Sequence, residues 1–189
     1  MDHERWLAPL TGAIAMGTAL GIVAVYVYGR ELPVEHVATV STRVPVAPAR
    51  AWELLSDPGR RPDWTPHVAR IGRVEDVAGR PTWRELDASQ DRFDFTVVSD
   101  TFPTFEVAAA HPEDIGMIAT WRWTLAADGD GTRVTLTERG SIDNLLFRGV
   151  WALRTGPWEG VEEDLSAFGR ALGGDGVLQR VEGTRSASP

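Results

Sequence analysis

Two side chains are the candidates for acid–base chemistry in this chain, Glu138 and His67. Glu138 alternates in phase with Val134 and Leu136, which would point it inward from a strand. The alternative is that the strand has already reached solvent at this position. His67 stands beside Pro and Trp in DWTPHV. A histidine in such a setting is more commonly a packed or solvent-facing residue than a catalyst. No residue is therefore assigned a catalytic role from the sequence, and these two remain candidates.

Several other chemistries lack the residues they need. The chain has no cysteine, so it offers neither a thiol nucleophile nor a thiolate metal site. The run DGDG at 128–131 lacks the further ligands of a calcium loop and fits a hairpin turn. No glycine-rich phosphate loop opens a helix, and no serine has the G-x-S-x-G context. We therefore expect no metal and no cofactor.

Aromatic side chains are the stronger indication of a binding function. Apolar cavities with few polar groups are the usual sites for small hydrophobic ligands. The alternative for each ring is that it fills the core, as aromatic residues commonly do. The candidate ligand-binding residues, each expected on an inward or mouth position, are Trp64, Phe93, Phe95, Trp121, Trp123 and Trp151.

The N-terminal region contains a long uncharged run, Leu7–Tyr28. A helix needs roughly 20 apolar residues to cross a bilayer, and this run has that length. A cleaved signal peptide is the alternative, but the apolar region is long and no clear cleavage site follows. The sequence therefore predicts a single-pass membrane protein with the bilayer as a partner.

Charges and small residues around this run support two further expectations. Arg30 and Arg43 follow the run, whereas Arg5 precedes it, which favours a cytoplasmic C-terminal domain. Gly17 and Gly21 lie four residues apart on one helix face, where small residues allow close helix pairing. A homodimer through these glycines is one interpretation, and the alternative is that glycine is simply common in membrane spans.

The remaining chain has the character of one globular domain with short ends. The net charge is −8 and the basic residues are scattered, so a nucleic-acid partner is not expected. We divide the chain into an anchor and linker at 1–35, a ligand-binding domain that begins at His36 and covers 36–173, and a disordered tail at 174–189. The tail is rich in Gly and Ser and poor in apolar residues.

Hydrophobic periodicity changes several times between these ends. A β-branched run at 36–44 predicts a strand, and the segment 45–60 predicts a helix ended by Asp57-Pro58-Gly59. About six mostly antiparallel strands follow, including a hairpin around DGDG. From Asp143 the period is helical, with an interruption near Gly156-Pro157 that could kink or split the helix. This order predicts an α+β domain.

Three segments carry a resemblance to a known family. PVAPARAWELLSDPGRRPDWTPHV, WRWTLAADGDGTRVTLTERG and the helical region Asp143–Leu172 resemble the START-like, or SRPBCC, superfamily in its polyketide cyclase/dehydrase-like branch. The resemblance covers about 37–172. It implies a helix-grip fold, in which a curved antiparallel sheet wraps a long C-terminal helix and leaves an apolar cavity, with His67 near its mouth. Members bind lipids, polyketides or other hydrophobic molecules, and some are enzymes.

Three functions are consistent with these observations. The leading interpretation is a membrane-anchored binding or carrier protein for a hydrophobic small molecule, without a reaction. The second is an enzyme of the cyclase/dehydrase type that uses Glu138 or His67 as its acid–base group. The third is a membrane-tethered interaction module, in which the domain acts as a docking surface.

Overall fold

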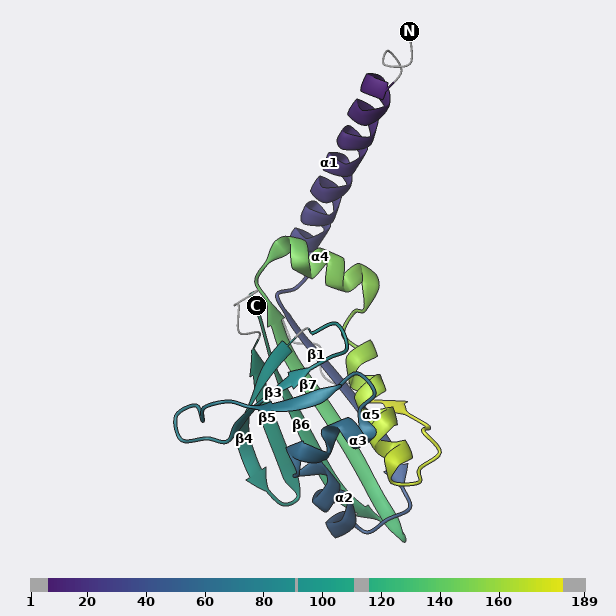
Figure 1. Ribbon diagram of the computed structural model, residues 1–189. Helices are drawn as coiled ribbons and strands as arrows, with labels where there is room; N and C mark the ends of the chain where they lie inside the picture. Colours follow the sequence, from purple (N-terminus) through teal and green to yellow (C-terminus); the bar gives the residue numbers. More distant parts are fainter. Residues whose placement is uncertain (1–6, 91, 111–115, 182–189) are drawn as a thin grey trace.

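One antiparallel sheet organises the chain (Figure 1). The computed structural model describes residues 7–90, 92–110 and 116–181, with 7–16 as backbone alone. In the sheet the strands lie in the order β2-β3-β4-β5-β6-β7-β1-β8. Their bounds are β1 Glu35–Val44, β2 Arg70–Arg73, β3 Thr82–Leu86, β4 Arg92–Thr101, β5 Thr104–Ala110, β6 Met117–Asp128, β7 Gly131–Ile142 and β8 Gln179–Arg180.

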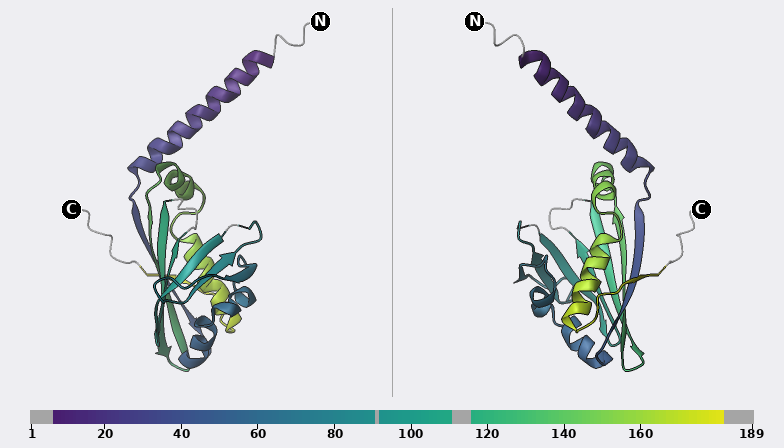
Figure 2. Two further views of the ribbon diagram at one scale, coloured as in Figure 1. Left: turned by 60° about the vertical axis from the view of Figure 1, so that its left-hand side comes forward. Right: turned by 90° about the vertical axis from the view of Figure 1, so that its right-hand side faces the viewer.

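The helices lie at one face and at the two ends of this sheet (Figures 1 and 2). The C-terminal helix α5 crosses the concave face, while the short helices α2 and α3 close one end of the sheet. Helix α1 extends away from the domain and only its last turns reach α4. The helices are α1 Leu7–Glu31, α2 Pro48–Leu55, the 3-10 helix η1 Pro58–Arg60, α3 Arg61–Trp64, α4 Leu145–Arg154 and α5 Glu159–Ala171.

Strand alternation places the core between the sheet and α5. The hairpin of β6 and β7 turns at Gly129-Asp130 and pairs Trp123 with Leu136 on the inner face. Leu165 and Phe168 of α5 are fully buried against this face. Apolar residues two apart on strands and three or four apart on the helix produce this match. The predicted α+β fold, with a sheet curved around a C-terminal helix, is confirmed.

The helical C-terminal region is two helices rather than one. Gly156 has a φ of +68°, a conformation that favours glycine, and it separates α4 from α5. Asn144 caps α4 through its side-chain oxygen, which accepts a hydrogen bond from the backbone N–H of Phe147. Only α5 packs on the concave face of the sheet, whereas α4 packs on α1.

The last turns of α1 are tied to the domain by close backbone contact. Gly29 is buried, and its carbonyl accepts a hydrogen bond of 2.8 Å from the guanidinium of Arg148, itself buried on α4. A second nitrogen of Arg148 donates to the carbonyl of Ile142 at 2.8 Å. A Cβ at Gly149 would collide with the backbone of Val25, so glycine is required where these helices cross.

No helix in the described part of the chain is both long and apolar enough to cross a membrane. This finding contradicts the predicted single-pass membrane localisation with a cytoplasmic domain, and that prediction is corrected. The apolar run 7–28 instead belongs to a helix whose last turns pack on α4. Nothing lies within 4 Å of a Cβ built at Gly17 or Gly21, and their pairing across a homodimer remains a prediction.

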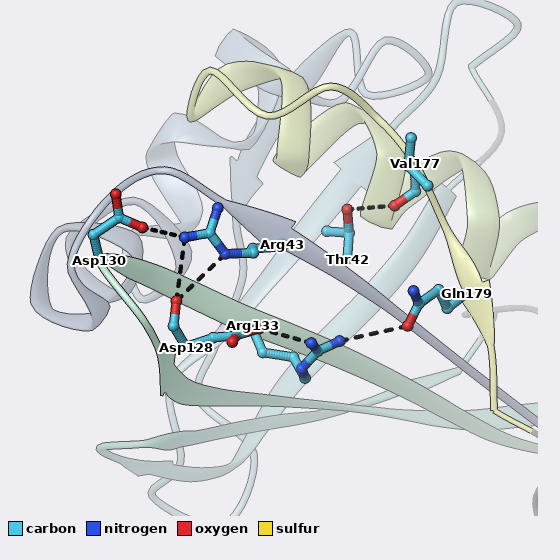
Figure 3. Close-up of polar contacts among 7 residues, drawn as sticks. All are labelled: Thr42, Arg43, Asp128, Asp130, Arg133, Val177 and Gln179. Atoms are coloured by element: carbon cyan, nitrogen blue, oxygen red, sulfur yellow. Dashed lines mark hydrogen bonds and ion pairs between the residues drawn. The ribbon is translucent and has the colours of Figure 1, made fainter.

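The segment after α5 returns to the edge of the sheet, which differs from the expected start of a disordered tail at residue 174 (Figure 3). β8 pairs with Val40 and Ser41 of β1. The hydroxyl of Thr42 donates to the carbonyl of Val177 at 2.8 Å. A side-chain hydroxyl and an unpaired strand edge can therefore order a Gly-rich segment that has few apolar residues. Residues 182–189 lie outside the described residues.

Candidate functional site

A cavity of about 250 Å³ lies between the concave face of the sheet and α5. Strands β3, β4, β6 and β7 form its wall, and α3, its following loop and α5 form the opposite side. The lining combines aromatic and apolar side chains with several charged ones. The residues are Arg61, His67, Val68, Glu85, Leu86, Asp87, Phe93, Phe95, Met117, Trp121, Glu138, Gly160 and Asp164.

Strand register brings the sheet residues of this wall together. Glu85 of β3 is opposite Phe93 of β4, and Trp121 of β6 is opposite Glu138 of β7. The ring centroids of Phe95 and Trp121 are 5.6 Å apart. Since side chains on one face of a sheet recur every second residue, each strand contributes its inward set to one surface.

A buried guanidinium lies at the centre of the polar part of the lining. Arg61, the first residue of α3, has its Nε 2.5 Å from Oε1 of Glu85 and its Nη2 3.7 Å from Oδ2 of Asp164. Glu85 also accepts a hydrogen bond of 2.9 Å from the indole N–H of Trp83. The guanidinium carbon lies 4.9 Å from the ring centroid of Trp64, within range of a cation–π contact.

Opposing effects act on the charge of Arg61. Burial by itself would lower the pKa of its guanidinium, but the carboxylates of Asp164 and Glu85 outweigh burial and raise that pKa. The group therefore stays positively charged at every accessible pH. A permanent charge held by two carboxylates fixes the position of both acids at the cavity wall.

His67 and Asp164 form the second polar contact of the cavity. Nε2 of His67 lies 3.4 Å from Oδ1 of Asp164, and the imidazole is 43% exposed. The histidine therefore stands at the opening of the cavity, as the resemblance implies, with a carboxylate beside it. The carboxylate of Asp164 and the imidazole of His67 thus lie next to each other at the cavity opening.

Glu138 reaches the cavity from β7 and is buried, so the alternative of a solvent-exposed strand end is wrong. Its Oε1 lies 2.9 Å from Nε2 of His36, and each side chain is 9% exposed. The His36 ring also contacts Trp151 of α4, with centroids 4.6 Å apart. His36, at the border between the predicted linker and the predicted strand, lies in β1, and its ring packs between this strand and α4.

The six predicted aromatic residues separate into three groups. Phe93, Phe95 and Trp121 line the cavity, which is where a ligand-binding residue would have to lie. Their role in ligand binding stays a prediction. Trp64 and Trp123 lie in the filled core with their centroids 6.1 Å apart. Trp151 is on α4 and contacts His36 rather than the cavity.

Three charged residues of the site, Arg61, Glu85 and Asp164, are not among the residues singled out from the sequence. Glu85 and Asp164 do carry a signal, because each occurs in phase with apolar neighbours. Glu85 alternates with Trp83, and Asp164 lies three residues after Val161 and next to Leu165 on the buried face of α5. A charge on an apolar face indicates a buried ion pair or a site.

Solved structures share this fold at low sequence identity. The di-domain ARO/CYC StfQ of the steffimycin biosynthetic pathway has a TM-score of 0.56 and 15% identity over 76% of this chain, which spans 52% of that protein. The Zhui aromatase/cyclase from Streptomyces sp. R1128 has a TM-score of 0.59 and 13% identity over 74% of this chain and 94% of its own. Norcoclaurine synthase from Thalictrum flavum has a TM-score of 0.58 and 12% identity over 73% and 93%.

A sequence relative matches a smaller part of the chain. Trigger factor from Aeromonas hydrophila is 36% identical over an alignment of 94 residues, and the match covers 38% of this chain and 21% of that protein. The chain thus spans about a fifth of trigger factor and about half of StfQ. This partial match does not assign a family.

A family model covers nearly the whole domain. Residues 35–172 match the model described as polyketide cyclase / dehydrase and lipid transport. The matched range begins at β1 and ends just after α5, so it contains every strand of the cavity wall and both helices opposite it. The chain therefore belongs to the polyketide cyclase/dehydrase and lipid transport family, within the SRPBCC superfamily.

Proposed function

We propose that this protein binds a small hydrophobic molecule, about one or two rings in size, in the cavity between the sheet and α5. The observation that carries the proposal is the cavity itself, which leaves about 250 Å³ unfilled beside Phe93, Phe95 and Trp121. Ligand pockets commonly measure about 300–1,000 Å³, and benzene occupies a cavity of about 150 Å³. The volume therefore favours a ligand smaller than a lipid or a multi-ring polyketide.

Unfilled volume also favours binding over a docking module. A domain that served only as a surface would gain stability from a closely packed core, because empty space forfeits van der Waals contacts. Here the cavity persists next to a tightly packed cluster that includes Trp123, Leu136 and Phe168. Family membership supports the same function, since the family description includes lipid transport.

Native mass spectrometry of the full chain, purified gently from cells, tests the proposal. We expect a reproducible bound mass that disappears after organic extraction. Gly160 of α5 lines the cavity, and a Cβ built there meets nothing within 4 Å. Gly160 is itself exposed, so Gly160→Leu should place a side chain at the rim of the cavity and reduce or abolish the bound mass. Ala171→Leu adds a similar side chain to an exposed position of α5 and should retain it.

Two outcomes would refute the binding proposal. One is an apo mass for the wild type that also takes up nothing from a mixed pool of small aromatic compounds. The other is equal binding by the wild type and by a folded Gly160→Leu variant, because the ligand would then lie elsewhere. Circular dichroism of both leucine variants establishes that they are folded.

An acid–base enzyme is a second candidate, favoured by the polar partner found beside each candidate residue. Glu138 pairs with His36, and His67 lies beside Asp164. In a dehydration, a base removes a proton from the carbon next to a carbonyl, an acid protonates the leaving hydroxyl, and water departs. Two acid–base groups lining one cavity meet the requirement for such a reaction.

Dehydration of 4-hydroxy-4-phenylbutan-2-one, a one-ring β-hydroxy ketone, tests the enzyme candidate. The product is a conjugated enone that absorbs in the ultraviolet, so the rate is read directly. Loss of a general acid or base commonly costs about 10²–10⁴-fold in rate. We expect His67→Asn or Glu138→Gln to lose activity on this scale if the protein catalyses the reaction. A wild-type rate equal to the uncatalysed rate would exclude this activity.

A further inference from the structure

Acidic groups outnumber basic ones in the cavity lining. Among the described residues, four carboxylates line it, those of Glu85, Asp87, Glu138 and Asp164, against the guanidinium of Arg61. Glu85 is the nearer partner of Arg61, at 2.5 Å against 3.7 Å for Asp164. An anionic ligand would enter this cavity against electrostatic repulsion.

Asp164 has an oxygen that is left without a hydrogen bond. The residue is 8% exposed, and Oδ1 accepts no hydrogen bond from any residue that the structure describes. Its other oxygen, Oδ2, lies 3.7 Å from Nη2 of Arg61, a long ion pair. Nε2 of His67 comes within 3.4 Å of Oδ1, but it forms no hydrogen bond there and its side chain is 43% exposed. Since a buried acceptor without a donor is costly, a donor group of the ligand would stabilise this carboxylate.

Aromatic faces lie next to these carboxylates. Phe95 lines the cavity and its ring centroid is 5.8 Å from the guanidinium carbon of Arg61, so this ring already accommodates a cation. Trp121 lies beside Phe95 and opposite Glu138. Aromatic faces attract cations through the negative charge above the ring, and carboxylates attract them directly. The two kinds of side chain together favour an organic cation.

We propose that the ligand is a small aromatic amine whose protonated nitrogen donates a hydrogen bond to Oδ1 of Asp164 while its ring packs on Phe95 and Trp121. This inference rests on the proposed binding function and specifies its ligand class. It assigns Asp164 the role of a specificity-determining residue. The ammonium supplies the missing donor and offsets the excess of negative charge.

Four one-ring probes of matched shape test this assignment by isothermal titration calorimetry with the full chain. They are 2-phenylethylamine, a cation; 3-phenylpropionate, an anion; 2-phenylethanol, a neutral donor; and ethylbenzene, which has no polar group. A hydrogen bond to a charged group contributes about 1.5–3 kcal/mol, which corresponds to about ten- to a hundredfold in affinity. We expect the amine to bind tighter than ethylbenzene by this factor and the propionate to bind weakest.

An isosteric variant ties the preference to one residue. Asp164→Asn removes the charge with little change in volume and should reduce the preference for the amine over ethylbenzene to less than about threefold. Asp130→Asn is the matched control, because it removes the same charge from a side chain that is 95% exposed. This control should retain the preference.

The outcomes separate the two proposals. If ethylbenzene or the propionate binds as tightly as the amine, the ligand is not a cation, and the binding proposal stands. If the amine preference survives in Asp164→Asn, the ammonium is bound by another group and the role of Asp164 is wrong. If none of the four probes binds, the cavity proposal itself fails. The comparison among probes uses the wild type alone, so it holds even if Asp164→Asn does not fold.

Discussion

Glu138 on β7 and His36 on β1 form a buried pair, with Oε1 of the carboxylate 2.9 Å from Nε2 of the imidazole. The pair connects the cavity wall to α4, because Glu138 lines the cavity while His36 contacts Trp151. His36 also lies directly over Gly140, where any Cβ would strike the imidazole ring. These contacts therefore fix the positions of β7, the His36 ring and α4 relative to one another.

Truncation of Glu138 should destabilise the domain through His36. In Glu138→Ala the imidazole loses its partner in a buried position, which commonly costs about 1–3 kcal/mol. Glu138→Gln retains an amide oxygen at the same place and should cost less. The measurement is the free energy of unfolding in urea, with the slope of the transition compared among variants.

Glu53→Ala is the control for this comparison. Glu53 is on α2 with its side chain 61% exposed, and we expect its replacement to change the free energy of unfolding by less than about 0.5 kcal/mol. Equal stability of Glu138→Ala and the wild type would mean that the pair contributes nothing, and that water can replace the carboxylate beside His36.

Trp121 and Trp123 show how much of the fold the sequence predicts. Their alternation correctly assigns both to one face of β6. It does not distinguish the ring that lines the cavity from the ring that is 2% exposed in the core. Alternation determines the face of a strand, whereas depth depends on where α5 crosses that face. The crossing follows from packing among distant elements, which a local pattern does not contain.

The buried ion pairs in the cavity show a second limit of prediction from the sequence. Arg61, Glu85 and Asp164 are separated by tens of residues and belong to a helix, a strand and another helix. Glu85 and Asp164 interrupt the apolar pattern of their own elements, but the tertiary fold decides that both of them meet Arg61. The partner of His36 could not be predicted for the same reason, because the imidazole at the start of the predicted strand meets Glu138 of β7 only in the folded sheet.

Replacement of Arg61 should destabilise the fold, because its positive charge compensates the buried carboxylates of Glu85 and Asp164. In Arg61→Met, Glu85 and Asp164 keep their charges in a largely buried setting without a compensating cation. Removing one partner from a buried ion pair commonly costs about 3–5 kcal/mol. We expect a loss of this order in the free energy of unfolding at neutral pH, measured by urea denaturation.

Two further variants identify the cause of that loss. The triple variant Arg61→Met, Glu85→Gln and Asp164→Asn carries no buried charge at these positions and should recover most of the stability. Arg60→Met changes the adjacent arginine, which is 41% exposed and 3.6 Å from Asp63, and should have little effect. If the triple variant were no more stable than Arg61→Met, the loss would come from packing of the arginine side chain and not from charge.

The crossing of α1 over α4 depends on glycine at both helices. Gly149→Ala places a methyl group against the carbonyl oxygen of Val25, and backbone cannot move aside as a flexible side chain can. We expect the last turns of α1 to detach, which should raise amide hydrogen exchange over residues 23–30. Gly21→Ala is the matched control, because its added methyl group meets nothing within 4 Å, and exchange at 23–30 should stay as in the wild type. Equal exchange in both variants would mean that α1 does not dock on α4 in solution.

The pair of Glu162 and Arg180 makes attachment of the C-terminal segment depend on pH. The hydrogen bond from Arg180 lowers the pKa of Glu162, an effect that charge attraction assists and partial burial opposes. An acid whose pKa is lowered in the folded state stabilises that state at neutral pH, and this contribution is lost as the pH falls from about 4.3, the ordinary value, through the lowered pKa. Carbon-13 NMR should show the Glu162 carboxyl titrating below its ordinary range, and Arg180→Gln should raise the midpoint. Arg170→Gln removes a charge from the same helix and should leave it unchanged. An unchanged midpoint in Arg180→Gln would mean that β8 is held by its backbone bonds to β1 and not by this pair.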